Sequence, residues 1–264
     1  MFPSAENDDV VTSPYNSLFS LYEIMKHADC SLPIDNESLF RVVEKVEEKV
    51  AKGTGNGKEV AKGSEITGKQ KKPYDKMNNI VANLLSNLTC SMRFEGVLNV
   101  DFNEITMNLV PYPDLHFLLP SLAPLYSLAD SRLQPRKLDE VFQDICDKEN
   151  QLIEVSPLSR TYLAMGLIMR GKVAFSDVNR NIRLLREKKN LRFVHWNSEG
   201  FKYGICNTPP VGQDYSLLCL GNNTCISDKF SQMEKSFSKL YKKKLYTHHY
   251  EQYLDSGEHF EETK

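Results

Sequence analysis

An apolar run at residues 161–171, TYLAMGLIMRG, constrains the fold more than any other segment of the chain. It carries one charged residue and ends at a glycine, which predicts a buried strand. A buried strand needs neighbouring strands and covering helices, because its backbone must be hydrogen-bonded away from water. Further strands are predicted near residues 115–119, at 192–196 and at 215–222, and helices near 137–147, at 176–189 and at 227–244. The second half of the chain is therefore predicted to form a two-layer α+β sandwich.

The first half of the chain is predicted to be mostly helical. Ser13 is placed to cap a helix at 13–28, and Pro14 fits its first turn. A second helix is predicted at 35–51, with Asp35 or Asn36 at its start. The segment 74–92 is apolar on nearly all sides, which predicts a buried central helix. A short helix is expected near residues 101–109.

Composition excludes several classes of protein. The 264-residue chain is 41% hydrophobic and 26% charged, with a formal net charge of −2. This balance argues against wholesale binding to nucleic acid or to an anionic membrane. No apolar run is long enough for a transmembrane helix. The six cysteines are scattered without a C-x-x-C pair, which predicts reduced thiols and no metal site.

A polar insertion at residues 52–72 contains a misleading motif. Gly63 to Lys69, GSEITGK, matches the G-x-x-x-x-G-K pattern of a phosphate-binding loop. The next residue is Gln70, so the hydroxyl that binds magnesium is missing, and no predicted strand precedes the motif. Pro73 prevents a helix from starting directly behind it. The insertion is therefore interpreted as a flexible surface segment without a nucleotide site.

The stretch RFEGVLNVDFNEITMNLVPYP, residues 93–113, resembles the signature region of the tubulin family. Other motifs follow in tubulin order and spacing over almost the whole chain apart from the insertion: SPYNS (13–17), PIDNESLF (33–40), RFVHWNSEGFKYGI (192–205), GNNTCI (221–226) and LYKKKLYTHHY (240–250). The insertion and HADCSLPIDNESLF (27–40) are similar to a centriole-associated branch of this family.

The resemblance implies an α/β and α+β fold divided as tubulins are. Residues 1–72 correspond to the end of the nucleotide-binding domain with the insertion, 73–92 to the central helix, 93–226 to the intermediate sandwich domain and 227–264 to the start of the C-terminal helices. The glycine-rich loop GGGTGSG of tubulins does not occur in the sequence. The chain is thus expected to be the C-terminal half or so of such a protein, as a fragment, a short isoform or an incomplete gene product.

Two carboxylates at the start of the short helix, Asp101 and Glu104, have two interpretations. Their spacing is typical of a capping box, which would make both structural. In tubulins, the loop matched by Gly96–Glu104 enters the next subunit's nucleotide site, where an acidic residue orients the water that attacks the γ-phosphate. The resemblance assigns that catalytic role, in trans, to Glu104, with Asp101 in support.

The resemblance also assigns contacts to GTP. Tyr74 matches the aromatic residue that stacks on the base, and Asn36 and Asn78 match the amides that read the guanine edge. Asp9 and Ser13 fall where tubulins contact the ribose, although serine replaces the usual acid at residue 13. The alternatives are that Asn36 caps its helix and that Tyr74 packs at the start of the central helix. Magnesium is expected only together with the missing phosphate loop.

These residues lead to two functional hypotheses. The first is a cytoskeletal subunit of microtubules or centrioles that binds GTP when full length and contacts delta-tubulin or alpha- and beta-tubulin. The second is a nucleotide-free module that binds other tubulins. The chain alone is expected to bind GTP weakly or not at all and not to hydrolyse it. Both hypotheses place the protein in the cytoplasm, at the cytoskeleton and the centrosome.

A basic cluster near the C-terminus has two interpretations. It is either a solvated helix end or a partner-binding face, and it consists of Lys242–Lys244, His248 and His249.

Overall fold

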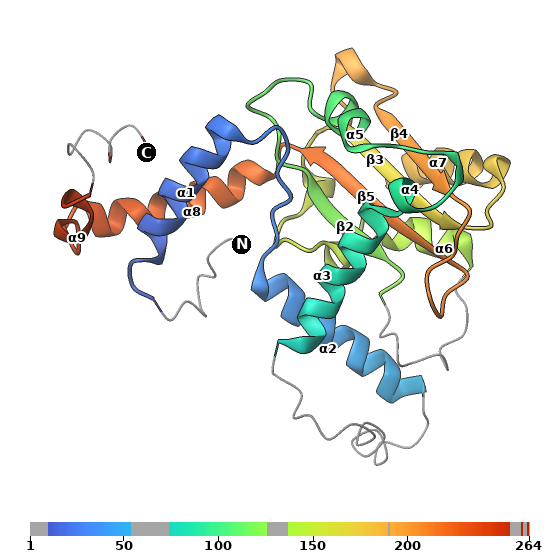
Figure 1. The fold of residues 1–264 in the computed structure, drawn as a ribbon, viewed down its shortest axis with the longest axis horizontal. Coiled ribbons are helices and arrows are strands. Elements are labelled where there is room, and N and C mark those ends of the chain that lie inside the picture. The colour runs from blue at the N-terminus through green and yellow to red at the C-terminus, as the bar shows by residue number, and fades with distance from the viewer. Residues whose placement is uncertain are drawn as a thin grey trace.

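A computed structural model describes residues 10–53, 74–125, 137–189, 191–253, 260 and 263. Its centre is a five-stranded mixed sheet with the strand order β1-β4-β3-β5-β2 (Figure 1). The strands are β1 (Gly96–Leu98), β2 (Leu119–Ala123), β3 (Tyr162–Gly171), β4 (Phe201–Cys206) and β5 (Tyr215–Asn223). The helices are α1 (Ser13–His27), α2 (Asn36–Gly53), α3 (Asp75–Leu88), α4 (Cys90–Arg93), α5 (Phe102–Leu109), α6 (Leu138–Asp144), α7 (Phe175–Lys189), α8 (Ile226–Tyr241) and α9 (His248–Glu251).

The middle strand of the sheet is β3, as its apolar sequence predicts. It pairs with β4 in parallel and with β5 in antiparallel orientation, and all of its residues are buried. The outer strands β1 and β2 pair antiparallel with β4 and β5. The predictions at 161–171 and 215–222 are confirmed by β3 and β5.

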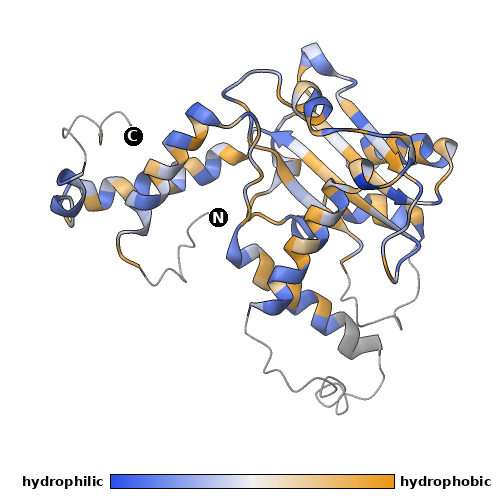
Figure 2. Cartoon of the chain, in the orientation of Figure 1, coloured by the Kyte–Doolittle hydropathy of each residue, from blue (hydrophilic) through white to orange (hydrophobic). Residues whose placement is uncertain are grey.

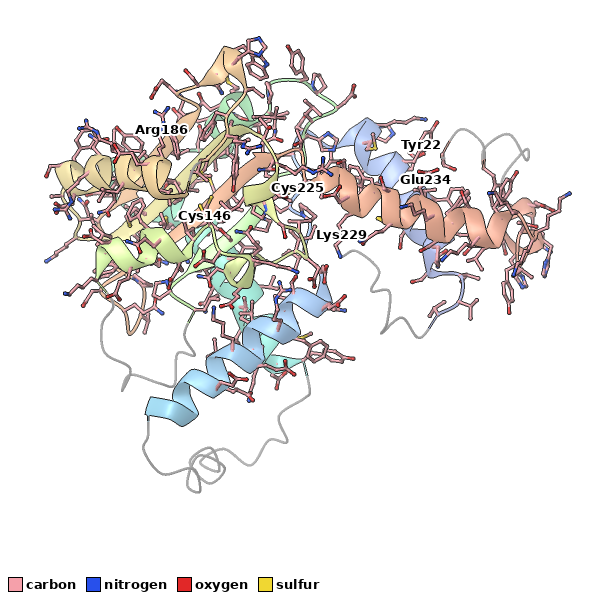
Figure 3. The ribbon with its side chains drawn as sticks, turned by 180° about the vertical axis from the view of Figure 1, so that it is seen from behind. Tyr22, Cys146, Arg186, Cys225, Lys229 and Glu234 are labelled. Atoms are coloured by element: carbon pink, nitrogen blue, oxygen red, sulfur yellow. The ribbon has the colours of Figure 1, made fainter. Side chains whose placement is uncertain are left out.

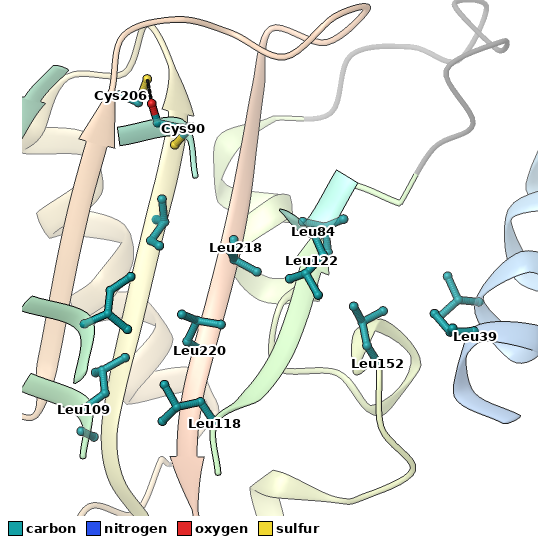
Figure 4. Close-up of a cluster of buried hydrophobic side chains, with 14 of the residues drawn as sticks. Leu39, Leu84, Cys90, Leu109, Leu118, Leu122, Leu152, Cys206, Leu218 and Leu220 are labelled. Atoms are coloured by element: carbon teal, nitrogen blue, oxygen red, sulfur yellow. Dashed lines mark hydrogen bonds between the residues drawn. The ribbon is translucent and has the colours of Figure 1, made fainter. Parts of the chain in front are cut away.

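Helices cover both faces of the sheet. On one face, Met165, Leu167 and Met169 of β3 pack with α6 and α7. On the other face, Ala164 and Ile168 face a cluster that includes Leu39 of α2, Leu84 of α3 and Leu109 of α5 (Figure 4). Hydrophobic residues are accordingly concentrated on the strands and along the sides of α2 and α3 (Figure 2). The sheet with α6 and α7 confirms the predicted mixed α/β sandwich, and the central helix α3 adds a layer on the opposite face.

A separate arm is formed by α1 and α8, which lie side by side away from the sheet (Figure 1). Tyr15 of α1 is fully buried, and its ring lies 5.3 Å from that of Phe237 on α8 and 5.9 Å from that of Phe260. The Tyr15 hydroxyl donates a hydrogen bond to the carbonyl of Leu245, 3.0 Å away. An aromatic cluster therefore joins the beginning of the described chain to its end.

Two strand predictions differ from the structure. The segment 192–196 is not a strand: Phe193 makes one parallel bridge to Tyr162, and the chain then turns in a short 3-10 helix, His195–Asn197. The reason is that β4, which the sequence analysis missed, occupies the same edge of β3 from Met165 onward. The strand expected near 115–119 begins at Leu119, because the ladder with β5 runs from Leu119 to Ala123.

Helix ends also differ in places. Ser13 is the first helical residue of α1 and not its cap, which is Thr12 without a side-chain hydrogen bond. The predicted central helix breaks at Thr89 into α3 and α4, and Leu85 on its outer side is half exposed. The helix α8 ends at Tyr241, so Lys242–Lys244 lie beyond it in turns.

Some sequence predictions fall outside the described residues. These are the ribose contact at Asp9, the motif Gly63–Lys69 and most of the insertion. The proposed domain boundaries stay predictions.

Candidate functional site

Asp101 and Glu104 both lie at the start of α5, but the two carboxylates have different roles in the structure. Asp101 is the N-cap of α5, and its Oδ1 accepts a hydrogen bond from the backbone N–H of Glu104 at 2.7 Å. The reciprocal hydrogen bond of a capping box, from the backbone N–H of Asp101 to the Glu104 carboxylate, is not formed among the described residues. Glu104 is exposed, and no described residue forms an ion pair with its carboxylate. Only Asp101 is therefore used in capping.

Several buried contacts hold α5 against the sheet. A side chain at Gly166 of β3 would collide with Leu109, because an added Cβ would lie 2.7 Å from its Cδ1. The buried amide of Asn222 on β5 donates hydrogen bonds to the carbonyls of Leu109 (2.8 Å) and Leu115 (2.7 Å). These residues fix the helix that presents Glu104. The sequence analysis missed both Gly166 and Asn222, although a glycine inside a strand pattern is a signal of close packing.

Removing the cap of α5 should destabilise the protein moderately. For Asp101→Ala we expect a loss of about 1 kcal/mol in the free energy of unfolding, because one orphan N–H at the helix start loses its acceptor. Urea unfolding of the wild-type chain and the variant measures this change. Glu104→Ala is the matched control and should cost less, since its side chain caps nothing; equal losses would contradict this division of roles.

Exposed apolar side chains lie on the helix that carries Glu104 and just after it. Met107 on α5 is 81% exposed, and Phe102 at the start of this helix is also exposed. Tyr112, which follows α5, lies with its ring 6.2 Å from that of Trp196, and both are about half exposed. We call Phe102, Met107, Tyr112 and Trp196 the α5 patch. Clusters of exposed aromatic and apolar residues with a polar rim are typical of protein-binding surfaces.

A small pocket lies between α5 and the sheet. Its volume is about 270 Å³, and Glu104, Asn108 and Lys202 are among its polar lining residues. The amide of Asn108 donates to the carbonyl of Glu104 at 2.6 Å, which leaves the Glu104 carboxylate without this partner. The arrangement offers a carboxylate acceptor at the surface.

The three residues assigned to the guanine base lie on α2 and α3, which pack together. Tyr74 directly precedes α3, is 52% exposed, and places its ring 6.4 Å from that of Phe40 on α2. Asn78 lies one turn into α3 and is exposed, and Asn36 lies one turn before Phe40 and is half-buried. The structure therefore brings the N-terminal parts of both helices together.

The alternative roles of these residues are partly resolved. Asn36 does not cap α2, because Asp35 does: its Oδ1 accepts from the N–H of Ser38 at 3.1 Å. The contact of Tyr74 with Phe40 agrees with packing at the start of α3, and it still leaves half of the tyrosine exposed. Ser13 lies elsewhere, on the α1–α8 arm.

A network of charges fastens α2 to the loop after the short helix at Lys148–Asn150. Arg41 of α2 contacts Glu154 at 3.0 Å, and Lys148 contacts the same carboxylate at 2.7 Å. Burial by itself raises the pKa of Glu154, but the hydrogen bond from Lys148 and the charges of Arg41, Lys148 and Lys229 outweigh it, so the pKa is lowered. The ionised carboxylate is thus the form that the folded protein favours.

This lowered pKa predicts a pH dependence of stability. The unfolded chain should bind the proton at the ordinary pKa of about 4.5, and the folded chain only at lower pH. The stability that Glu154 contributes is therefore present above pH 4.5 and is lost as the pH falls through the folded pKa. Urea unfolding of the wild-type chain and Glu154→Gln should give a difference that shrinks from pH 7 to pH 3. A difference independent of pH would contradict the assignment.

The thiols do not resemble catalytic nucleophiles. None of the six cysteines forms a disulfide. Burial raises the pKa of Cys30 to about 11 and that of Cys225 to about 12, and the negative charges of Asp29 and Asp228 add to these shifts. Such thiols are almost entirely protonated at neutral pH and are poor nucleophiles.

Two further features concern the described part of the chain, metal-binding groups and membrane-spanning helices. It holds no group of three or more His, Cys, Asp or Glu residues that could bind a metal. The adjacent rings of His248 and His249 lie 4.0 Å apart. No helix among the described residues is long and apolar enough to cross a membrane.

Comparison with known proteins identifies the class of fold. Residues 113–235 match the family model of the tubulin C-terminal domain. The chain is 52% identical over 257 residues to the tubulin epsilon chain of Mus musculus, and this alignment covers 95% of the chain and 53% of the mouse protein. It is 50% identical over 256 residues to the tubulin epsilon chain of Homo sapiens, with the same coverage. It is 30% identical over 258 residues to the tubulin alpha chain of Pneumocystis carinii, again with 95% and 53% coverage.

Nearly the whole chain is therefore similar to tubulins, and residues 113–235 match their C-terminal domain. Its greater identity to the two epsilon chains than to the alpha chain confirms the predicted resemblance to the epsilon branch. The chain spans about half the length of the curated relatives it matches.

Proposed function

We propose that the chain acts as a tubulin-type cytoskeletal subunit that joins other tubulins end to end, with Glu104 placed at the guanine nucleotide of the neighbouring subunit. One observation carries this proposal. Asp101 caps α5, and the Glu104 carboxylate remains exposed and unpaired among the described residues. An acceptor that projects from a surface helix is suited to orienting an attacking water in a partner's site. Asp101 supports the site by fixing the helix start.

The α5 patch supports the same assignment. Phe102 and Met107 lie on α5, within three residues of Glu104. Tyr112 follows this helix, and its ring contacts that of Trp196 in the 3-10 helix His195–Asn197. Burial of such residues in an interface would place Glu104 in a site from which water is largely excluded, where its charge acts more strongly. The partners are other tubulins; the family suggests delta-tubulin and alpha- and beta-tubulin.

A second part of the proposal concerns the chain's own nucleotide. Tyr74, Asn36 and Asn78 form the base-reading half of a GTP site, since a ring can stack on guanine and an amide matches its donor and acceptor edge. Asp9 and Ser13 belong to this proposal as ribose contacts. Stacking and two amide contacts correspond to millimolar affinity at best, roughly 4 kcal/mol. Tight binding with Mg²⁺ and hydrolysis are proposed only together with a glycine-rich phosphate loop.

Complex formation with αβ-tubulin tests the proposed interface. Sedimentation velocity should detect a complex with the wild-type chain, and Tyr112→Ala with Trp196→Ala should weaken it by about 30-fold or more, the loss expected of paired aromatic hot spots. Tyr253→Ala is the matched control, because Tyr253 is 85% exposed at the other end of the molecule. Equal binding by the double variant and the control would refute the assignment of the α5 patch.

A nucleotide-free interaction module is the second candidate function. It is favoured by the same α5 patch, because apolar contacts need no nucleotide. The two candidates differ when the partner is stripped of nucleotide. The subunit proposal predicts weaker binding to nucleotide-free αβ-tubulin, whereas the module predicts unchanged binding. On either proposal the protein works in the cytoplasm at the cytoskeleton, and the epsilon relatives suggest the centrosome and centriole.

A further inference from the structure

A buried ion pair connects the C-terminal helix α8 to the start of α2. Lys229 Nζ lies 2.9 Å from Asp35 Oδ2, and the two residues are 9% and 2% exposed. Figure 3 shows Lys229 near the beginning of α8, on the side where α2 starts. Removing two charges from water is costly and is offset only when the geometry is good and the remaining donors and acceptors are satisfied. A buried pair is therefore weak support for stability and is better explained by a need for a defined arrangement.

The position of Lys229 in its helix makes this pair more informative. The lysine lies in the first turn of α8 (Ile226–Tyr241), where the positive end of the helix dipole disfavours a cation. The neighbouring Asp228 suits that turn and pairs at the surface with Arg160, 2.8 Å away. The helix dipole and burial both disfavour a positive charge on Lys229. The ion pair with Asp35 is therefore what stabilises the lysine at this position.

Asp35 also makes the hydrogen bonds that fix the backbone next to Asn36, the residue that follows it. Its Oδ1 accepts from the N–H of Ser38 at 3.1 Å, and its Oδ2 accepts from the N–H of Glu154 at 3.2 Å. Its own N–H donates to the carbonyl of Leu152 at 3.1 Å. Contacts from α2, α8 and the loop at 152–154 thus fix the backbone just before Asn36. The cap is provided by Asp35, so the Asn36 amide is not needed for it.

The helix α8 also holds the other N-terminal helix. Tyr15 and Phe237 place α1 along α8, and Lys229 lies about two turns before Phe237 on the same helix. The start of α2 and the body of α1 are therefore both positioned by α8. A displacement of α8 would change the position of Asn36 through the ion pair.

We propose that Lys229 is a positioning residue for guanine recognition: through its ion pair with Asp35 it holds the Asn36 amide in place and links the nucleotide base to the C-terminal helix. The ligand class is a guanine nucleotide. The inference rests on the proposed base-reading role of Asn36 and adds a residue that has no contact with the base. It implies that binding of a partner to α8 changes the affinity for the base at Asn36, and that binding of the base changes the affinity for the partner.

The test uses the 264-residue chain and variants that separate positioning from folding. Asp35→Asn with Lys229→Met removes both charges. The asparagine keeps an acceptor for the Ser38 N–H and loses the acceptor of the Glu154 N–H. Such neutral replacements of a buried pair usually preserve folding. Lys229→Arg retains the pair, and Lys235→Met is the matched control on the exposed side of α8. NMR spectra report the Asn36 side-chain amide, and titrations with GTP and with ATP at millimolar concentration report base preference.

We expect the double variant to melt as one cooperative unit, to shift the Asn36 amide signals and to lose about tenfold in its preference for GTP over ATP, the value of one well-placed hydrogen bond. Lys229→Arg and Lys235→Met should behave as the wild-type chain does. An unchanged Asn36 signal and unchanged preference in the double variant would overturn the positioning role alone. A wild-type chain without any base preference would refute the guanine site itself, and the positioning role with it.

Discussion

Glu104→Gln is expected to slow GTP hydrolysis in assemblies with αβ-tubulin by about 10²–10⁴-fold, the usual contribution of a positioned acid–base group. Glutamine keeps the size of the side chain and removes the negative charge that we propose orients the attacking water. The wild-type residue is exposed and unpaired within the described chain, so the fold should be unaffected. The measurement is phosphate release per assembled subunit, with melting temperature as the check on folding.

The control for this prediction is Glu95→Gln. Glu95 is also exposed and lies just before the loop that leads to α5. Its replacement removes the same charge at another exposed position, outside the proposed site, so hydrolysis should stay within about twofold of wild type. If Glu104→Gln and Glu95→Gln hydrolyse GTP equally fast, Glu104 is only a surface residue of α5.

Phe237→Ala should have the largest effect on stability. Phe237 is fully buried, and its ring lies 5.3 Å from Tyr15, 6.4 Å from Phe19 and 5.6 Å from Tyr241. We expect the free energy of unfolding to fall by about 3–5 kcal/mol, because the truncation removes aromatic contacts and leaves a cavity. That is a large share of the 5–15 kcal/mol typical of a folded domain.

The loss should be local to the α1–α8 arm, because this aromatic cluster is separate from the sheet core. Hydrogen exchange should speed up in α1 and in the C-terminal part of α8 before it does in β3. Phe175→Ala, at a half-exposed ring on α7, is the control and should cost far less. Uniform acceleration across β3 and β5 would show that the arm and the sheet unfold as one unit.

The pattern of apolar residues was sufficient to predict those elements in which burial of apolar side chains decides the structure. The all-apolar segment 161–171 has to be a central strand, because no other position removes it from water, and the structure places it there as β3. The apolar stripes of α1, α2 and α8 predicted those helices within a few residues. In these elements the local pattern and the tertiary packing require the same structure.

The sequence failed where a distant partner decides the structure. The segment 192–196 has strand-like residues, yet the edge of β3 that it needs is taken by β4, whose half-exposed residues and glycine gave a weak pattern. Lys229 is similar: an amphipathic helix pattern predicts a surface lysine, and only the fold brings Asp35, distant in the sequence, beside it. Likewise, only the cap geometry shows that Asp101 caps α5.

The measurement that tests the central proposal most directly is photo-crosslinking from the start of α5. A photoreactive amino acid at the exposed position 103, next to Glu104, would be activated in assemblies with αβ-tubulin, and the crosslinked peptides identified by mass spectrometry. The proposal predicts crosslinks to peptides that line the partner's nucleotide site, weakened by Tyr112→Ala with Trp196→Ala. Stable complexes whose crosslinks reach only this chain, or a partner surface remote from its nucleotide, would contradict it.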